Sequence, residues 1–229
     1  MKVIGMLGGM SWESTQTYYR AVNEGVKQAL GGLHSAQILL YSVNFAEIER
    51  LQHEGRWDEL AEMLSQAARS LEAGGADFLL ICTNTMHKLA PQIAASIRIP
   101  ILHLADATAV ALQEDGVRCV GLLGTRFTME QDFYRQRLEA KGIQVVVPDV
   151  EDRERVHQVI YTELCRGVIK SVSRQAYLSV IHRLTLQQAE AVILGCTEIG
   201  MLVRQSDTLV PLYDTTLIHA QQAVKMALE

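Results

Sequence analysis

The sequence predicts an α/β protein of two similar halves, each a four-stranded parallel-sheet domain. Short apolar, β-branched runs alternate with longer helical patterns, which is typical of the α/β class. The runs are continuously hydrophobic, as in strands that are buried on both faces of a parallel sheet. A set of repeated segments, in the same order in each half, predicts the duplication, and we expect a pseudo-twofold axis to relate the halves.

The expected elements follow from composition and spacing. Eight runs have the character of buried strands, at residues 2–7, 36–43, 77–81, 99–102, 118–123, 144–147, 191–194 and 208–212. Helical patterns occupy residues 57–73, 129–141, 174–188 and 215–228. The first of these has apolar residues three and four apart and ends at Gly74-Gly75, a favourable helix end.

Three pairs of segments carry the repeat. VIGMLG recurs as CVGLLG, FLLICTNT resembles VILGCTE, and IPILHLADAT resembles TLVPLYDTT. We therefore expect a first domain of residues 1–102 with 214–229, and a second of residues 103–213. Ligands of open α/β sheets bind beyond the carboxyl ends of the strands, where the repeated polar residues lie. One cleft between the halves is the expected site.

Composition excludes several classes of function. The 229 residues are 48% hydrophobic and 21% charged, as in an ordinary soluble globular protein, and the net charge of −5 predicts no nucleic-acid partner. No apolar run is long enough for a membrane span, and the chain enters a strand directly, so we expect neither a leader nor a membrane partner. Four scattered cysteines predict neither a disulfide framework nor a metal site, and favour a cytoplasmic location.

The second pair of repeated segments raises a question of register. When the apolar strands are aligned by their ends, Cys82 lies opposite Gly195, and Thr83 lies opposite Cys196. Successive strand residues point to opposite faces, so Cys82 is expected to be buried and Thr83 to enter the cleft. The two halves then agree in position and differ in chemistry.

Together, LGGM near the N-terminus, CTNTMH after the third strand, LLGT in the second half and GCTE near the end resemble the aspartate/glutamate racemase superfamily. The resemblance covers essentially the whole chain. It is closest to the broad-specificity amino-acid racemases and the L-Asp/Glu-specific racemases of enteric bacteria. It implies the Asp/Glu racemase fold, a homodimer, an amino-acid substrate and no cofactor, pyridoxal phosphate included. It also places Thr83 and Cys196 at the two catalytic positions.

The chemistry that this implies is removal of an α-proton from one face of an amino acid and its return to the other. A thiol suits either role because its pKa can be tuned. A threonine hydroxyl is a far weaker acid and base. Three outcomes stay open: Thr83 transfers protons slowly, Cys82 reaches round to replace it, or catalysis favours one enantiomer.

Further residues are expected around the substrate. Backbone N–H groups and hydroxyls near two strand-to-helix turns are suited to the α-carboxylate, and the resemblance adds two pocket positions. The first set is Asn84, Thr85, Thr197 and Glu198, and the second is Met10 and Gln52. Glu198 is alternatively an orienting partner of Cys196 or a first-turn carboxylate. Thr125 is expected either to bind carboxylate or to cap a helix.

Typical aspartate racemases carry an arginine near Gln52 and a lysine in the long second-half helix. This chain has Arg50 close to the first position, but only Tyr161, Glu163 and Leu164 near the second. The missing cations favour neutral or medium-sized side chains over aspartate alone. His87, which follows the first motif, is expected either to orient a catalytic group or to lie on a helix surface.

Two rival functions remain at this point. One is a related enzyme of the same fold that uses Cys196, such as a maleate isomerase, hydantoin racemase or decarboxylase. The other is a protein that binds amino acids without catalysis, after loss of the first cysteine.

Overall fold

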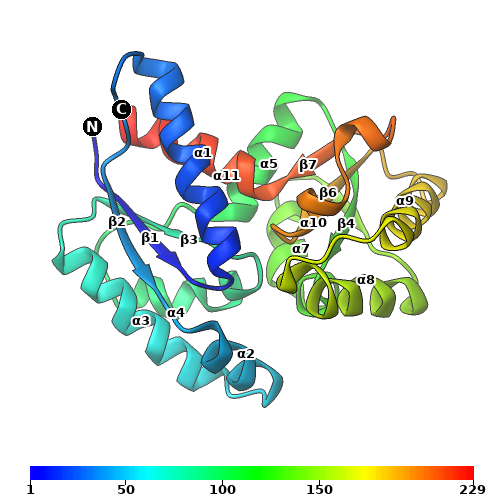
Figure 1. The fold of residues 1–229 in the computed structure, drawn as a ribbon, viewed down its shortest axis with the longest axis horizontal. Coiled ribbons are helices and arrows are strands. Elements are labelled where there is room, and N and C mark those ends of the chain that lie inside the picture. Colours follow the sequence, from blue (N-terminus) through cyan, green and yellow to red (C-terminus); the bar gives the residue numbers. More distant parts are fainter. The chain divides into compact units, whose positions relative to one another are not determined.

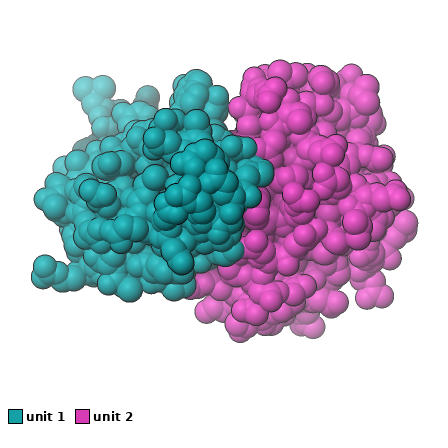
Figure 2. All heavy atoms as spheres, turned by 90° about the horizontal axis from the view of Figure 1, so that it is seen from below, with its two compact units in different colours: residues 1–104, 219–229 teal, residues 105–218 magenta.

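The computed structural model describes residues 1–229, and its alternating strands and helices confirm the α/β prediction (Figure 1). The chain divides into two compact units, residues 1–104 with 219–229 (unit 1) and residues 105–218 (unit 2), coloured separately in Figure 2. The chain therefore crosses between the units twice, after Leu104 and before His219. None of its helices combines the length and apolar character required to cross a membrane.

Unit 1 contains a parallel sheet of three strands in the order β2-β1-β3. The strands are β1 (Ile4–Gly8), β2 (Ile38–Ser42) and β3 (Phe78–Ile81). The predicted fourth strand at residues 99–102 is reduced to an isolated bridge between Leu79 and Ile101. Pro100 explains part of this, because proline has no N–H to donate to a strand ladder.

Helices cover both faces of this sheet. Unit 1 contains α1 (Trp12–Leu30), α2 (Phe45–His53), α3 (Trp57–Ala73), the 3₁₀ turn η1 (Thr85–Leu89), α4 (Ala90–Ala95) and most of α11 (Thr215–Leu228). One apolar cluster joins the sheet to α2, α3 and α4, and a second joins it to α1 and α11. Helix α3 spans the predicted residues, with Leu60, Leu64 and Leu71 in the core and Gly74 as its C-cap.

Unit 2 contains a four-stranded parallel sheet in the order β5-β4-β6-β7. Its strands are β4 (Cys119–Gly124), β5 (Gln144–Val146), β6 (Ala191–Gly195) and β7 (Leu212–Asp214). The last strand begins later than the predicted 208–212. The Gln205 side-chain amide donates to the carbonyls of Thr208 and Val210 at 3.0 Å each. The segment before Pro211 is therefore a loop that the Gln205 side chain holds in place.

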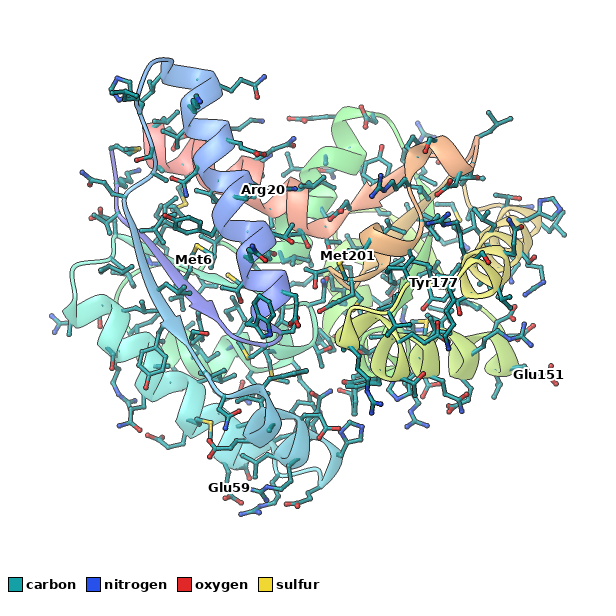
Figure 3. All side chains as sticks on the ribbon, in the orientation of Figure 1. Met6, Arg20, Glu59, Glu151, Tyr177 and Met201 are labelled. Atoms are coloured by element: carbon teal, nitrogen blue, oxygen red, sulfur yellow. The ribbon has the colours of Figure 1, made fainter.

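Unit 2 contains helices at both of the regions that the patterns predict, residues 129–141 and 174–188, and several further helices. They are α5 (Leu104–Glu114), α6 (Arg126–Glu130), α7 (Asp132–Glu139), α8 (Val150–Thr162), η2 (Leu164–Arg166), α9 (Ser171–Leu186), α10 (Ile199–Leu202) and η3 (Gln205–Asp207). The predicted helix 129–141 is instead two helices, separated where Gln131 is extended. Tyr177 of α9, labelled in Figure 3, is buried and donates to the Val156 carbonyl of α8 at 2.8 Å.

The two sheets share one internal plan. VIGMLG and CVGLLG supply β1 and β4, and each of these strands pairs on both sides. Strands β3 and β6 occupy the next place in each sheet. The bridge at Ile101 and strand β7 follow at the same edge. The repeat read from the sequence therefore corresponds to equivalent strands, although the first half forms three strands rather than four.

Candidate functional site

The end of β3 separates Cys82 from Thr83. The Cys82 side chain is 0% exposed and packs among Met6 and Leu80, whereas Thr83 retains contact with solvent. Burial raises the pKa of the Cys82 thiol far above its ordinary value. A thiol in this environment is an inert core group, because neither thiolate formation nor access to a ligand is favoured.

Side chains from two other elements hold the backbone around Thr83. The Ser14 hydroxyl of α1 donates to the Cys82 carbonyl at 3.1 Å. The Nδ1 atom of His87 lies 2.8 Å from the Thr83 carbonyl oxygen. Asn84 and Thr85 follow as buried polar residues at the start of η1. Side-chain hydrogen bonds to two consecutive carbonyls therefore fix the backbone at the end of β3.

The end of β6 is built around a cysteine and a carboxylate. Gly195 ends the strand, and a Cβ there would lie 2.7 Å from the Leu123 carbonyl, so only glycine lets β4 and β6 approach this closely. Cys196 comes next and is partly exposed. Its thiol donates to Glu198 Oε2 at 3.0 Å, and the Thr197 hydroxyl donates to the same oxygen at 2.6 Å. Glu198 is only 4% exposed.

This environment determines the resting state of the thiol. Burial is the largest cause that raises the pKa of Cys196 well above its ordinary value, and the Glu198 carboxylate adds to it. Cys196 is therefore a protonated thiol at neutral pH. Its hydrogen bond to the adjacent Glu198 carboxylate holds the thiol proton in a fixed direction.

The turns after the first strand of each unit have different surroundings. Gly9 has φ +90°, and a Cβ there would collide with the Val43 backbone, so the turn requires glycine. Met10 is 5% exposed and packs into the apolar cluster with α2 and α3. Thr125 accepts a bond from the Thr128 N–H at 3.4 Å as the N-cap of α6, which is one of its two expected roles.

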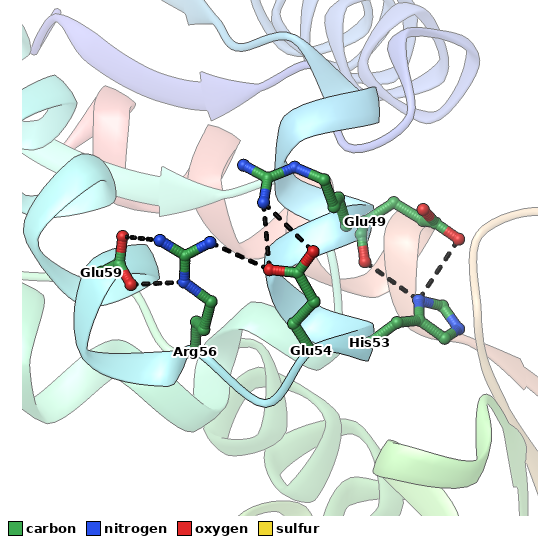
Figure 4. A network of polar contacts seen from close by, with 6 residues as sticks. Glu49, His53, Glu54, Arg56 and Glu59 are labelled. Atoms are coloured by element: carbon green, nitrogen blue, oxygen red, sulfur yellow. Dashed lines mark hydrogen bonds and ion pairs between the residues drawn. The ribbon is translucent and has the colours of Figure 1, made fainter.

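Helix α2 presents Gln52 and Arg50 to different surroundings. Gln52 is 3% exposed, whereas the Arg50 guanidinium is exposed and bonds Glu54 at 3.0 Å. Figure 4 shows that ion pair within a surface network in which Glu54 also bonds Arg56. Arg50 is therefore engaged at the surface, and Gln52 is the inward-facing polar group of this helix.

The position at which typical aspartate racemases carry a lysine is occupied in unit 2 by Tyr161, Glu163 and Leu164. Tyr161 packs edge-on against His157 with ring centroids 4.9 Å apart, and Leu164 is buried. Glu163 bonds Lys170 at 3.2 Å and Ser173 at 2.7 Å.

Metal ligation and disulfides are not features of either unit. No group of three or more His, Cys, Asp or Glu side chains is arranged to hold a metal ion. All four cysteines are free thiols.

Sequence reasoning left two roles unresolved here. His87 is 2% exposed, so the helix-surface alternative is wrong. The Ser14 hydroxyl bonds a residue 68 positions away, and no local pattern in the sequence signals such a contact. Ser11 is the side chain that caps α1.

Two units, each with a parallel sheet covered by helices, place the chain in the α/β class, and comparison with known proteins identifies the family. A profile of the Asp/Glu/hydantoin racemases matches residues 7–223. This chain belongs to that family and has the Asp/Glu racemase fold.

Three similar proteins place the chain within it. A crystal structure of a candidate Asp/Glu racemase from Yersinia pestis is 55% identical, with a TM-score of 0.94 and 100% of both chains covered. An aspartate racemase homologue from Pyrococcus horikoshii OT3 is 34% identical, with a TM-score of 0.88 and the same coverage. The broad-specificity amino-acid racemase RacX of Bacillus subtilis (strain 168) is 24% identical, over 97% of this chain and 96% of its own.

Proposed function

We propose that this protein is an amino-acid racemase that works without pyridoxal phosphate, with Thr83 and Cys196 as the two groups that exchange protons with the substrate α-carbon. The observation that carries the proposal is the partly exposed Cys196 thiol bonded to Glu198, at the strand end equivalent to that of Thr83. Family membership supports racemase chemistry as the reaction class.

The pairing of Cys196 with Glu198 supports both directions of proton transfer. For one enantiomer, the α-proton passes to the Thr83 oxygen, and the protonated Cys196 thiol delivers its own proton to the opposite face of the carbanion and becomes a thiolate. For the other, the thiol proton first passes to Glu198, the resulting thiolate removes the α-proton, and the Thr83 hydroxyl delivers its proton to the opposite face. Glu198 Oε2 lies 3.0 Å from the Cys196 sulfur, close enough to accept the thiol proton and to return it.

Thr83 rather than Cys82 is the proposed partner. The buried position and raised pKa of Cys82 argue against its turning toward a substrate, and Thr83 is the first residue beyond the strand with solvent contact. Because a hydroxyl is the weaker acid and base, we expect slow transfer on this side and faster processing of one enantiomer.

The substrates expected are amino acids with neutral or medium-sized side chains. Asn84, Thr85, Thr125 and Thr197 offer N–H and hydroxyl groups for the α-carboxylate, and Met10 and Gln52 are the proposed contacts of the side chain. Gln52 is inward-facing and uncharged, while Arg50 is paired with Glu54. Broad specificity, as in the name of the Bacillus subtilis relative, and L-Asp/Glu specificity are the two alternatives within this proposal.

A homodimer in a reducing, cytoplasmic setting is also part of the proposal. Edge strand β2 has Leu40 and Tyr41 exposed at 47% and 42%, and the four free thiols suit a reducing compartment. Light scattering on the purified chain tests the dimer, and a monomer at micromolar concentration would contradict it.

The test of the function is a panel of L- and D-amino acids in D₂O, followed by NMR and chiral chromatography, with hydantoins and maleate as additional substrates. A racemase inverts the α-carbon and labels it with deuterium. Labelling without inversion would indicate one-sided catalysis, and no labelling of any amino acid would contradict the proposal. Conversion of maleate or a hydantoin alone would assign the site to another reaction.

A further inference from the structure

His87 connects the strand end that carries Thr83 to the boundary of unit 1. Its Nε2 atom accepts a hydrogen bond from the Leu104 N–H at 3.2 Å, so this nitrogen carries no proton. The Nδ1 atom must therefore hold the proton and donate it to the Thr83 carbonyl at 2.8 Å. Both bonds require a neutral imidazole in a single tautomer.

The second feature is the place of this imidazole in the chain. Leu104 is the last residue of unit 1 before the first crossing, and His219 is the first residue after the second crossing. The ring of His87 lies 4.5 Å from that of His103 and 5.8 Å from that of His219, measured between centroids. Both covalent connections therefore leave unit 1 beside His87.

The same cluster is held by a second chain of hydrogen bonds. His219 Nε2 donates to the Leu102 carbonyl at 2.7 Å, and its Nδ1 accepts from the Tyr18 hydroxyl at 2.9 Å. Burial is the largest cause that lowers the pKa of His219, to about 3, so this ring is neutral at assay pH. His87, His103 and His219 are 2%, 6% and 0% exposed, so the three rings form a buried cluster.

We propose that His87 is a positioning residue for the racemase reaction, which fixes the Thr83 backbone and ties it to Leu104, where the chain first leaves unit 1. The inference rests on the proposed function, because it gives Thr83 a role in proton transfer. The physical reason is that the rate of proton transfer depends steeply on the distance between donor and acceptor. Proton transfer requires the donor and acceptor at hydrogen-bond distance, and a shift of 1 Å costs on the order of 10²-fold in rate.

Two amide substitutions separate the two bonds of His87. In His87→Asn the amide nitrogen occupies the place of Nδ1 and still donates to the Thr83 carbonyl. In His87→Gln the amide oxygen reaches the place of Nε2 and still accepts from the Leu104 N–H. His182→Gln, which alters an exposed histidine on α9, is the matched control.

The readouts are inversion, deuterium wash-in without inversion, and thermal melting. We expect His87→Gln to slow inversion by about 10-fold to 100-fold, while wash-in at the enantiomer addressed by Cys196 changes by less than about 3-fold. We expect His87→Asn to retain inversion within about 3-fold of the unsubstituted protein, and His182→Gln to change neither rate. A general structural defect would lower both rates together.

Several outcomes would overturn the inference. These are unchanged inversion in His87→Gln, an equal fall of inversion and wash-in in both variants, or loss of folded protein in both. Failure of the proposed function is recognised separately, since the unsubstituted protein would then show no inversion with any amino acid.

Discussion

The ends of β3 and β6 are equivalent in the two sheets, but the hydrogen bonds at the two ends involve different groups. At β6, the partly exposed Cys196 bonds a buried carboxylate two residues further along the chain. At β3, Thr83 receives support through its backbone carbonyl, from an imidazole four residues further along. The position equivalent to His87 in the second half is Gly200, where a Cβ would lie 2.6 Å from an Asp214 carboxylate oxygen.

This difference shows how a duplicated fold can assign unequal roles to equivalent positions. Glu198 acts directly on the ionisation of the thiol beside it, since its negative charge raises the pKa of Cys196. His87 contacts Thr83 through the backbone carbonyl of that residue, so it affects where the hydroxyl lies without adding a charge beside it. In the proposed mechanism, Glu198 influences the proton chemistry at the β6 end, and His87 influences the position of Thr83 at the β3 end.

The largest effect is expected from the thiol itself. Cys196→Ala removes the principal acid and base, and we expect inversion and deuterium wash-in to fall by about 10³-fold for every substrate. Chiral chromatography and NMR in D₂O measure both rates, with Cys119→Ser as a thiol control. Full activity in Cys196→Ala would remove the proposed mechanism.

The second prediction concerns a variant in which the ends of β3 and β6 carry the same side chain. Thr83→Cys places a thiol at both strand ends, and we expect inversion to be preserved or to rise by up to about 10-fold, with more equal rates for the two enantiomers. Steady-state kinetics with each enantiomer tests this. A Thr83→Cys protein that folds and loses inversion would show that the threonine is not in the acid/base position.

Removing the charge beside Cys196 tests the electrostatic half of the comparison. Because the carboxylate raises the thiol pKa, Glu198→Gln should lower that pKa and move the midpoint of Cys196 alkylation to lower pH. Inversion should fall by about 10-fold, since the relay partner is lost. Mass spectrometry of the Cys196 peptide after iodoacetamide treatment follows the alkylation, and an unchanged midpoint would contradict the argument.

The smallest effect is expected at the other cysteine of the first motif. Cys82→Ala removes a buried thiol from the core and should cost about 1 kcal/mol, or roughly 2–4 °C in melting temperature. Inversion should stay within about 2-fold of the unsubstituted protein. Calorimetry and the racemisation assay measure these, and a loss of inversion as large as that in Cys196→Ala would make Cys82 the catalytic thiol.

Local patterns account for much of the fold. Helix α3 begins and ends where its apolar spacing and the following glycines predict, and α11 spans the predicted residues. The differences arise where non-local contacts compete with composition. The run around Pro100 pairs only through Ile101, and Gln205 ties the loop before β7 by its side chain.

The sequence by itself determined the α/β class, the repeated plan of strands and the family, because these depend on periodicity and on motifs that are continuous in the chain. It also separated Cys82 from Thr83, since alternation along a strand is a local property. The hydrogen bonds that fix the backbone around Thr83 were decided only by the tertiary structure. Ser14 lies 68 positions from Cys82, and His87 reaches the unit boundary 17 positions away, where folding alone brings the partners together.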